Sequence, residues 1–238
     1  MIGDSAMLLA AGRGERMRPL TLTTPKPLVH VAHKPIIAYG LERLAAAHVR
    51  RAVVNVHWLA DQIEDWALRQ SAPPQMFISD ERDLLRDTGG GVAHALPLLG
   101  SDPFFVLNSD SFWIDGPRPA LERLRAAYDP ARMDALLLLC PAERAVGYDG
   151  RGDFDLRADG QLARPSPGMA APYVFAGLHI TRPELFAGAP AGAFSMNLLW
   201  NKAAAAGRLF GLAHDGRWTH VGTPDAIAGA EQALREGA

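Results

Sequence analysis

The sequence predicts an α/β fold in three layers, α/β/α and Rossmann-like, with a mostly parallel sheet extended by a small mixed β-region. Three observations predict it. Short apolar runs alternate with helical patterns through the first 140 residues. The chain of 238 residues is long enough to bury one large core. After residue 147 the alternation gives way to a hairpin pattern and short strands. We therefore expect a single domain over 1–238, divided into parts at 1–146 and 147–238.

The first part alternates predicted strands with predicted helices. One helix is opened by Pro35 and carries Ile37, Leu41 and Leu44 on one face. This alternation implies right-handed crossovers and a mostly parallel sheet, whose ligands bind beyond the carboxyl ends of the strands. The predicted strands lie at 6–11, 52–56, 76–79, 104–108 and 135–140. The further helices are expected at 59–68, 91–98 and 119–128.

The second part begins with a hairpin pattern that turns at Asp159-Gly160. Segment 164–172 is rich in proline and small residues, so we expect a mobile loop there. The remaining expected elements are hairpin strands at 154–156 and 161–163, a strand at 173–180, a helix at 194–206, strands at 209–214 and 218–221, and a last helix from 224 to about 235.

Bulk properties exclude several classes of partner. The net charge of −2 gives no reason to expect nucleic acid binding. No apolar segment reaches the roughly 20 residues that span a bilayer, and no signal peptide is evident. The single cysteine, Cys140, follows a run of leucines and is expected to be a buried thiol. We expect a soluble, cytoplasmic protein without membrane partners.

The segment 8–28 combines glycines with cations directly after the first predicted strand. Gly12 and Gly14 free backbone N–H groups to point at phosphate oxygens, while Arg16 and Lys26 neutralise charge. Lysine between two prolines belongs to a loop, because neither a helix interior nor a central strand accepts that pattern. These residues predict a triphosphate-binding site.

Three other interpretations of this loop fit its residues less well. An ordinary strand–turn–helix corner with solvated arginines is the simplest alternative, and the four residues occurring together disfavour it. No Gly-Lys-Ser/Thr follows at Walker A spacing, and Met17 stands where the dinucleotide fingerprint has its third glycine.

Asp110 stands at the end of the predicted strand at 104–108, two residues past Asn108, so we expect it to face the same crevice as the glycine loop. A hard oxygen ligand opposite a triphosphate fits Mg²⁺ bridging carboxylate and phosphate. A helix N-cap or turn aspartate is the alternative. The run Thr88-Gly89-Gly90-Gly91 precedes a predicted helix and permits close approach of a base or ribose, although it is also typical of a flexible turn.

The N-terminal block closely resembles the signature of sugar-1-phosphate nucleotidyltransferases, Leu-Ala-Ala/Gly-Gly-x-Gly-x-Arg-Met/Leu-x-Pro followed by Pro-Lys-Pro. The resemblance covers the full length, including the Thr-Gly-Gly-Gly block, the strand before Asp110, and Trp218-Thr219-His220-Val221-Gly222-Thr223. Blocks at 58–65, 151–154, 175–177 and 191–194 are similar to the branch of uridylyltransferases that act on N-acetylmuramate 1-phosphate.

This resemblance implies an in-line displacement in which a sugar 1-phosphate, N-acetylmuramic acid 1-phosphate in this branch, attacks the α-phosphorus of UTP and pyrophosphate leaves. It implies that Arg16 holds the β- and γ-phosphates, Lys26 the α-phosphate and sugar phosphate, and Asp110 the Mg²⁺. The implied nucleotide-binding part, 1–146, uses Leu9, Ala11, Gly12, Gly14, Arg16, Gly89 and Gly90. The implied sugar-binding part, 147–238, uses Gly152, Asp153 and Phe175.

The chain departs from the family pattern at three positions. Ser109 stands where glycine usually precedes the metal aspartate, and His220 replaces the second metal aspartate. We expect Mg²⁺ on Asp110, with His220 binding directly or through water, and Mn²⁺ or Co²⁺ as possible alternatives because imidazole suits softer metals. Asp225 ranks below His220. Arg164 replaces a lysine that holds the sugar phosphate in relatives, and it is either that cation or an exposed loop arginine.

Two alternative functions remain open at this stage. One is a mannose-1-phosphate guanylyltransferase, which shares almost every motif named above. The other is a regulatory protein that binds nucleotide sugars after its catalysis has decayed, which the change to His220 permits. The resemblance also implies a functional link to a sugar kinase in the recycling of cell-wall sugars. Base preference, sugar identity and oligomeric state are not fixed by the sequence.

Overall fold

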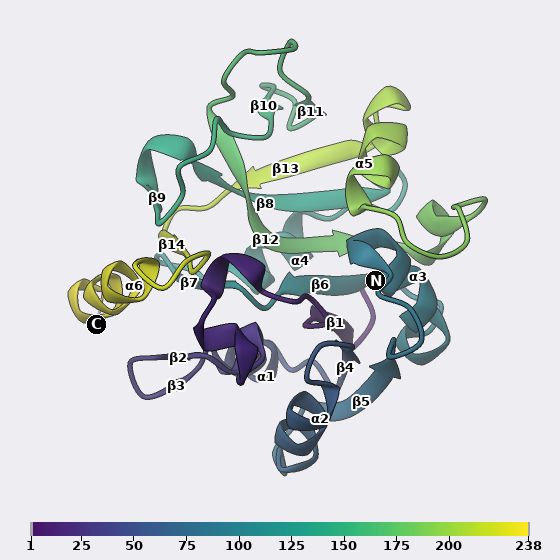
Figure 1. Cartoon of the computed structure of the whole chain (residues 1–238). Coiled ribbons are helices and arrows are strands. Elements are labelled where there is room, and N and C mark those ends of the chain that lie inside the picture. Colours follow the sequence, from purple (N-terminus) through teal and green to yellow (C-terminus); the bar gives the residue numbers. More distant parts are fainter. Residues whose placement is uncertain (1, 238) are drawn as a thin grey trace.

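The computed structural model describes residues 2–237 and is built around one seven-stranded sheet (Figure 1). The strand order is β13-β8-β12-β6-β1-β4-β5. All strands run parallel except β12, which pairs antiparallel with both β6 and β8. The strands are β1 (Ser5–Leu9), β4 (Arg51–Val56), β5 (Gln75–Asp80), β6 (Phe104–Asn108), β8 (Ala135–Pro141), β12 (Tyr173–Thr181) and β13 (Leu209–Ala213).

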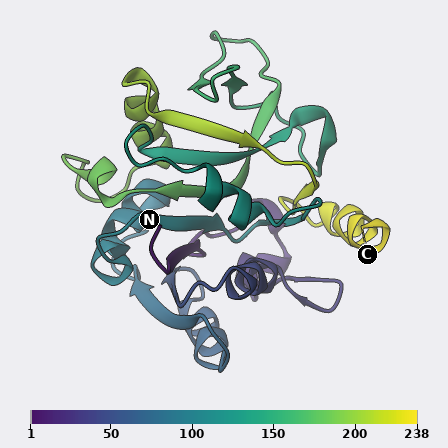
Figure 2. The same ribbon diagram turned by 180° about the vertical axis from the view of Figure 1, so that it is seen from behind.

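Helices cover both faces of this sheet (Figure 1, Figure 2). Alternate residues of β1 face opposite layers: Leu8 belongs to the core cluster that contains residues of α1, α2 and α4, while Met7 belongs to the cluster that contains residues of α3. Burial on both faces explains why the strands are continuous apolar runs. The helices are α1 (Ile36–Ala46), α2 (Ala60–Leu68), α3 (Asp87–Leu99), α4 (Ala120–Ala127), α5 (Met196–Ala205) and α6 (Ala226–Glu236). The predicted three-layer α/β class is confirmed.

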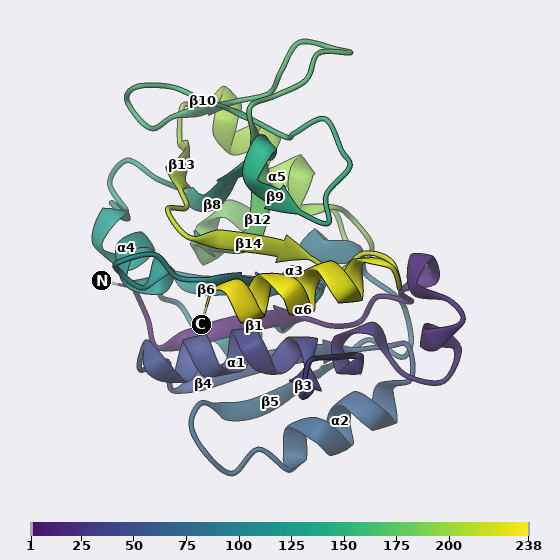
Figure 3. The ribbon, with the colours of Figure 1, turned by 90° about the vertical axis from the view of Figure 1, so that its left-hand side faces the viewer.

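Smaller sheets extend the central one, as the sequence predicted. A three-stranded sheet in the order β7-β14-β9 joins the two parts of the chain, and α6 lies beside it (Figure 3). In this sheet His220 of β14 stands opposite Ser111 of β7. The bounds are β7 (Ser111–Ile114), β9 (Ala145–Val146), β14 (Arg217–His220), β2 (His30–Val31), β3 (Lys34–Pro35), β10 (Asp155–Leu156) and β11 (Leu162–Ala163). Short 3₁₀ turns are η1 (Glu15–Met17), η2 (Leu20–Leu22), η3 (Lys26–Leu28), η4 (Ala142–Arg144) and η5 (Pro183–Phe186).

The main difference from the sequence prediction concerns the start of α3. The glycines at 89–91 were expected before a helix at 91–98, but α3 begins at Asp87 and includes all three. A Cβ on Gly90 would lie 2.2 Å from the carbonyl oxygen of Gly192. Close packing therefore outweighs the low helix propensity of glycine, about 1 kcal/mol per residue.

Other boundaries differ by a few residues. β1 ends at Leu9 rather than residue 11, because the Ala10 N–H donates to the side chain of Asn55 instead of to the backbone of a neighbouring strand. The helix expected from 194 begins at Met196, where Ser195 accepts a hydrogen bond from the Asn197 N–H. Cys140 is 1 % exposed and free, which confirms the buried thiol. Between residues 2 and 237, no helix has the length and apolar character of a membrane span.

Candidate active site

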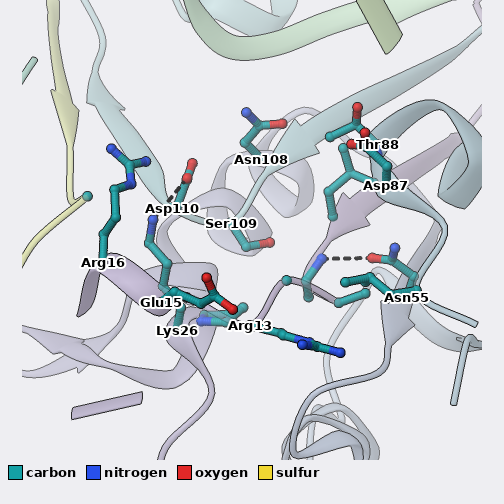
Figure 4. Close-up of a pocket in the computed structure, with 18 residues that line it drawn as sticks. Arg13, Glu15, Arg16, Lys26, Asn55, Asp87, Thr88, Asn108, Ser109 and Asp110 are labelled. Carbon is teal, nitrogen blue, oxygen red and sulfur yellow. Dashed lines mark hydrogen bonds and ion pairs between the residues drawn. The ribbon is translucent and has the colours of Figure 1, made fainter. Parts of the chain in front are cut away.

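A cavity of about 690 Å³ lies at the carboxyl ends of β1 and β6 (Figure 4). It is the side of the sheet at which the alternating pattern predicted a ligand. Seven of the predicted residues line it: Leu9, Ala11, Gly12, Gly14, Arg16, Lys26 and Asp110. Lining residues that the predicted site left out are Ala10, Arg13, Glu15, Pro27, Asn55, Leu85, Asp87, Thr88, Asn108, Ser109 and Gly222.

A buried polar chain fixes the start of the glycine-rich loop. The Ala10 N–H donates to Asn55 Oδ1 at 2.7 Å, and Asn55 Nδ2 donates to Glu81 Oε1 at 2.8 Å. Glu81 is fully buried, and its other oxygen accepts from the Arg86 N–H at 3.1 Å. These bonds hold the loop against β4 and the segment that follows β5. The sequence could have indicated this role of Asn55, because Asn55 is the one polar residue in the apolar run 52–56.

The two glycines of the loop serve different purposes. Gly14 has a φ of 62°, and a Cβ there would lie 2.9 Å from Thr21 Cγ2 and 3.0 Å from Lys26 Cβ. The Thr21 hydroxyl donates to the Gly14 carbonyl at 2.8 Å, so this glycine lets the segment carrying Lys26 pack closely. A Cβ on Gly12 would meet no atom within 4 Å, so its α-carbon borders open space in the cavity wall.

Three charged residues, Arg16, Lys26 and Asp110, lie together at one end of the cavity. Lys26 Nζ forms an ion pair with Asp110 Oδ2 at 3.0 Å, and Arg16 reaches the same end from η1 (Figure 4). Burial raises the pKa of Asp110, but the neighbouring His220 ring and the charge of Lys26 outweigh it and hold the pKa of this carboxyl well below its usual range. Asp110 is therefore an anion at neutral pH.

His220 is brought to Asp110 by the small sheet. The Val221 N–H donates to the Asp110 carbonyl at 2.9 Å, and His220 Nε2 lies 3.6 Å from Asp110 Oδ2. The His220 ring lies parallel to the Trp218 ring, with an interplanar angle of 3°. A Cβ on Gly222 would meet His220 Cε1 at 2.6 Å, so a side chain there would push the imidazole away.

Gly89 and Gly90 have a structural partner instead of a place in the cavity wall. A Cβ on Gly89 would lie 2.5 Å from the Phe194 ring. The Gly90 N–H donates to the Phe194 carbonyl at 3.0 Å, and Thr88 Oγ1 accepts from the Met196 N–H at 2.9 Å. Segment 192–196 therefore occupies the space into which side chains at 89 and 90 would point, and of this motif Thr88 is the residue that lines the cavity.

The predicted sugar-side residues form a separate group outside this cavity. Asp153 Oδ2 accepts from the Phe175 N–H at 2.9 Å, which ties the loop after Gly152 to β12. A Cβ on Gly152 would lie 2.0 Å from the Ala171 carbonyl oxygen, and its φ is 78°. This region borders the hairpin β10–β11 in the second part of the chain.

Arg164 is neither a free loop arginine nor a residue of the cavity wall. Its guanidinium lies 4.1 Å from the centre of the Phe154 ring and donates to Asn201 Oδ1 at 3.0 Å. It also donates to Asn197 and, at 3.3 Å, to the Asp153 carbonyl. Partial burial lowers the pKa of Arg164. The structure thus gives this side chain a structural role between the sugar-side loop and α5.

This fold and site define an α/β protein whose ligand cavity lies at the carboxyl edge of a parallel sheet. A model of the nucleotidyl transferase family matches residues 5–151. The chain belongs to this family, which confirms the resemblance to sugar-1-phosphate nucleotidyltransferases. It is 47 % identical over 97 % of both chains to N-acetylmuramate alpha-1-phosphate uridylyltransferase of Caulobacter vibrioides, and 40 % identical over 94 % of this chain and 98 % of the protein of that name from Neisseria meningitidis.

More distant similarities are consistent with this assignment. The catalytic subunit beta of mannose-1-phosphate guanylyltransferase from Drosophila melanogaster is 43 % identical, but over 45 % of this chain and 30 % of that protein. The mannose alternative is therefore the weaker one. The solved structure of an inositol-1-phosphate CTP transferase from T. maritima covers 100 % of this chain and 97 % of its own, with a TM-score of 0.79 and 16 % identity. That likeness shows the fold alone.

Proposed function

We propose that this protein transfers a uridylyl group from UTP to N-acetylmuramate 1-phosphate, giving UDP-N-acetylmuramate and pyrophosphate. The high identity over the full chain to two uridylyltransferases of that specificity supports the substrates. The observation that carries the chemistry is the meeting of Arg16, Lys26 and ionised Asp110 at one end of the cavity. Two cations and a carboxylate there suit phosphoryl transfer, which needs positioning and charge stabilisation more than covalent chemistry.

Each side chain has a distinct task in this proposal. Arg16 neutralises the β- and γ-phosphates, which leave as pyrophosphate, and its planar guanidinium can bind two phosphate oxygens together. Lys26 neutralises the α-phosphate and the attacking sugar phosphate as a point charge. The open wall at Gly12 lets the backbone of the loop approach the nucleotide closely. The polar chain through Asn55 and Glu81 holds that loop in place.

The residues around Asp110 fit a divalent cation. Asp110 supplies a hard, ionised oxygen, and His220 lies beside it. Among residues 2–237, no group of three or more His, Cys, Asp or Glu could hold a metal alone. A cation here would take its other ligands from phosphate oxygens and water, which is the usual mode for Mg²⁺. We propose that Asp110 and His220 are the protein ligands of this cation, which is Mg²⁺, Mn²⁺ or Co²⁺. A cation bound there would neutralise phosphate charge.

The acceptor sugar is proposed to bind on the 147–238 side of a single domain, where Gly152, Asp153 and Phe175 lie together. The substrate carries a phosphate on its anomeric oxygen, so a kinase or an equivalent phosphorylating enzyme must supply it. Arg164 contributes by holding this loop to α5 rather than by contacting the phosphate.

Pyrophosphate release tests the proposed function directly. The purified protein is incubated with each pair drawn from UTP, GTP, CTP and dTTP and from the 1-phosphates of N-acetylmuramate, N-acetylglucosamine, glucose and mannose, with Mg²⁺ or Mn²⁺. We expect the highest kcat/KM for UTP with N-acetylmuramate 1-phosphate. A higher value for GTP with mannose 1-phosphate would replace the proposal by the mannose alternative. Nucleotide binding without release from any pair would favour the regulatory protein.

A further inference from the structure

A buried hydroxyl without a protein partner lies in the cavity wall. Ser109 follows β6, is 4 % exposed, and donates its backbone N–H to the Leu9 carbonyl at 3.3 Å. Within residues 2–237 its Oγ atom has no hydrogen-bond partner. Leaving a buried hydroxyl unpaired costs free energy, so buried polar groups are nearly always satisfied. Because Ser109 lines the cavity, a bound ligand is the partner available to it.

The position of Ser109 along the cavity identifies the part of the ligand that it meets. Figure 4 shows Ser109 between the cationic end, with Arg16 and Lys26, and the opposite end, with Asn55 and Thr88. A nucleoside triphosphate is a linear arrangement of triphosphate, ribose and base. When the triphosphate lies against the two cations and the base lies toward the far end, the ribose occupies the middle of the cavity beside Ser109.

We infer that Ser109 Oγ hydrogen-bonds a ribose hydroxyl of the bound nucleotide and makes the site selective for ribonucleotides over deoxyribonucleotides. This inference rests on the proposed function, because it requires a nucleotide in the cavity. A serine hydroxyl both donates and accepts, so it pairs with either the 2′- or the 3′-hydroxyl. The glycine that usually precedes the metal aspartate in the family signature supplies no such group. Ser109 is thus a specificity-determining residue of this chain.

The test is calorimetric binding of UTP, 2′-deoxy-UTP and 3′-deoxy-UTP with a divalent cation present. We expect the unmodified protein to bind UTP about three- to tenfold more tightly than at least one deoxy analogue. Ser109→Ala should bind UTP and that analogue alike. The matched control is Ser111→Ala, because Ser111 is a buried serine, 5 % exposed, two positions further on and outside the cavity lining. It should keep the original selectivity.

Several outcomes would overturn the inference. Selectivity that survives in Ser109→Ala, or that is absent from the unmodified protein, excludes the ribose contact. Equal weakening of all three nucleotides in Ser109→Ala assigns the hydroxyl to a phosphate and overturns it as well. A lower Tm of Ser109→Ala without nucleotide shows that the hydroxyl is already satisfied inside the protein. Failure of the proposed function is distinguishable, because UTP would then not bind or no pair would release pyrophosphate.

Discussion

Lys26 pairs with Asp110 in the structure, and in the proposed reaction it pairs with phosphate. In the structure its ammonium pairs with Asp110 at 3.0 Å, and its side chain is only 11 % exposed. The proposed reaction needs the same ammonium against phosphate and the same carboxylate against a cation. Binding of nucleotide and metal therefore exchanges one ion pair for two new ones. This exchange keeps the buried ammonium and the partly exposed carboxylate paired, and an unpaired buried charge is strongly destabilising.

Replacing Lys26 tests its role at the level of a single charge. Lys26→Ala removes the cation that we propose neutralises the α-phosphate, and loss of one such stabilising group costs about 10²–10³ in rate. We expect kcat/KM for pyrophosphate release to fall by that factor. Lys34→Ala is the control, because Lys34 pairs with Glu42 away from the cavity and should leave the rate unchanged. Near-normal turnover of Lys26→Ala would remove Lys26 from the mechanism.

His220 predicts an unusual preference among metal ions. Imidazole suits Mn²⁺ and Co²⁺ better than Mg²⁺, which prefers oxygen ligands. We expect the unmodified protein to work better with Mn²⁺ or Co²⁺ than with Mg²⁺. His220→Asp should reverse that order, while His220→Ala should lower activity with all three ions. The measurement is kcat/KM with each ion, and an unchanged Mn²⁺ to Mg²⁺ ratio in His220→Ala would place this ring outside the site.

At the scale of elements, glycine appears in two structural settings near the site. In the loop after β1, Gly12 borders open space, where a ligand is expected. In the first turn of α3, Gly90 lies against segment 192–194, where no atom can be added. Gly12 thus leaves room for a ligand, while Gly90 allows close packing of α3, although both belong to glycine-rich motifs.

Alanine substitutions separate these two uses. Gly90→Ala forces α3 away from the Gly192 carbonyl, and overpacking of this kind lowers the free energy of unfolding by about 1–3 kcal/mol. Gly12→Ala should leave the free energy of unfolding nearly unchanged and weaken nucleotide binding instead. Urea denaturation and calorimetry measure the two effects. Equal stability of Gly90→Ala and the unmodified protein would show that segment 192–196 does not hold α3 as described.

At the scale of the whole molecule, the sheet encloses a histidine that no polar group satisfies. His179 of β12 is 1 % exposed, and neither ring nitrogen has a hydrogen-bond partner among residues 2–237. Its ring forms T-shaped contacts with the rings of Phe175 and Trp200. Burial lowers the pKa of His179 to about 3. The folded protein therefore holds this ring neutral, while the unfolded chain protonates it near pH 6.5.

This difference predicts acid sensitivity of the fold. Between pH 6.5 and 3 the unfolded state binds a proton on His179 that the folded state does not bind. The free energy of unfolding therefore falls as the pH falls. The loss is about 1.4 kcal/mol per pH unit, or about 2 kcal/mol at pH 5. His179→Leu removes the titrating ring. Urea denaturation at pH 7 and pH 5 should show a smaller loss for this variant, and an equal loss in both proteins would contradict the assignment.

Much of this architecture could be predicted from local patterns. The apolar runs are long enough and regular enough to identify the buried strands, and Asp110 could be placed at the cavity because it lies two residues after one of them. The antiparallel insertion of β12 between β6 and β8 could not be predicted, because a buried strand has the same composition in either direction. The structural role of Arg164 could not be predicted either, because its partners on α5 are distant in the chain.

The sequence by itself determined the fold class, the glycine-rich loop with its two cations and the carboxylate at a strand end, because those depend on neighbours along the chain. Only the tertiary structure decided how closely His220 approaches Asp110, that Asn55 holds Ala10, and that segment 192–196 fills the space at Gly90. These contacts join segments far apart in the chain. Their geometry follows from strand register and packing density, which no local pattern specifies.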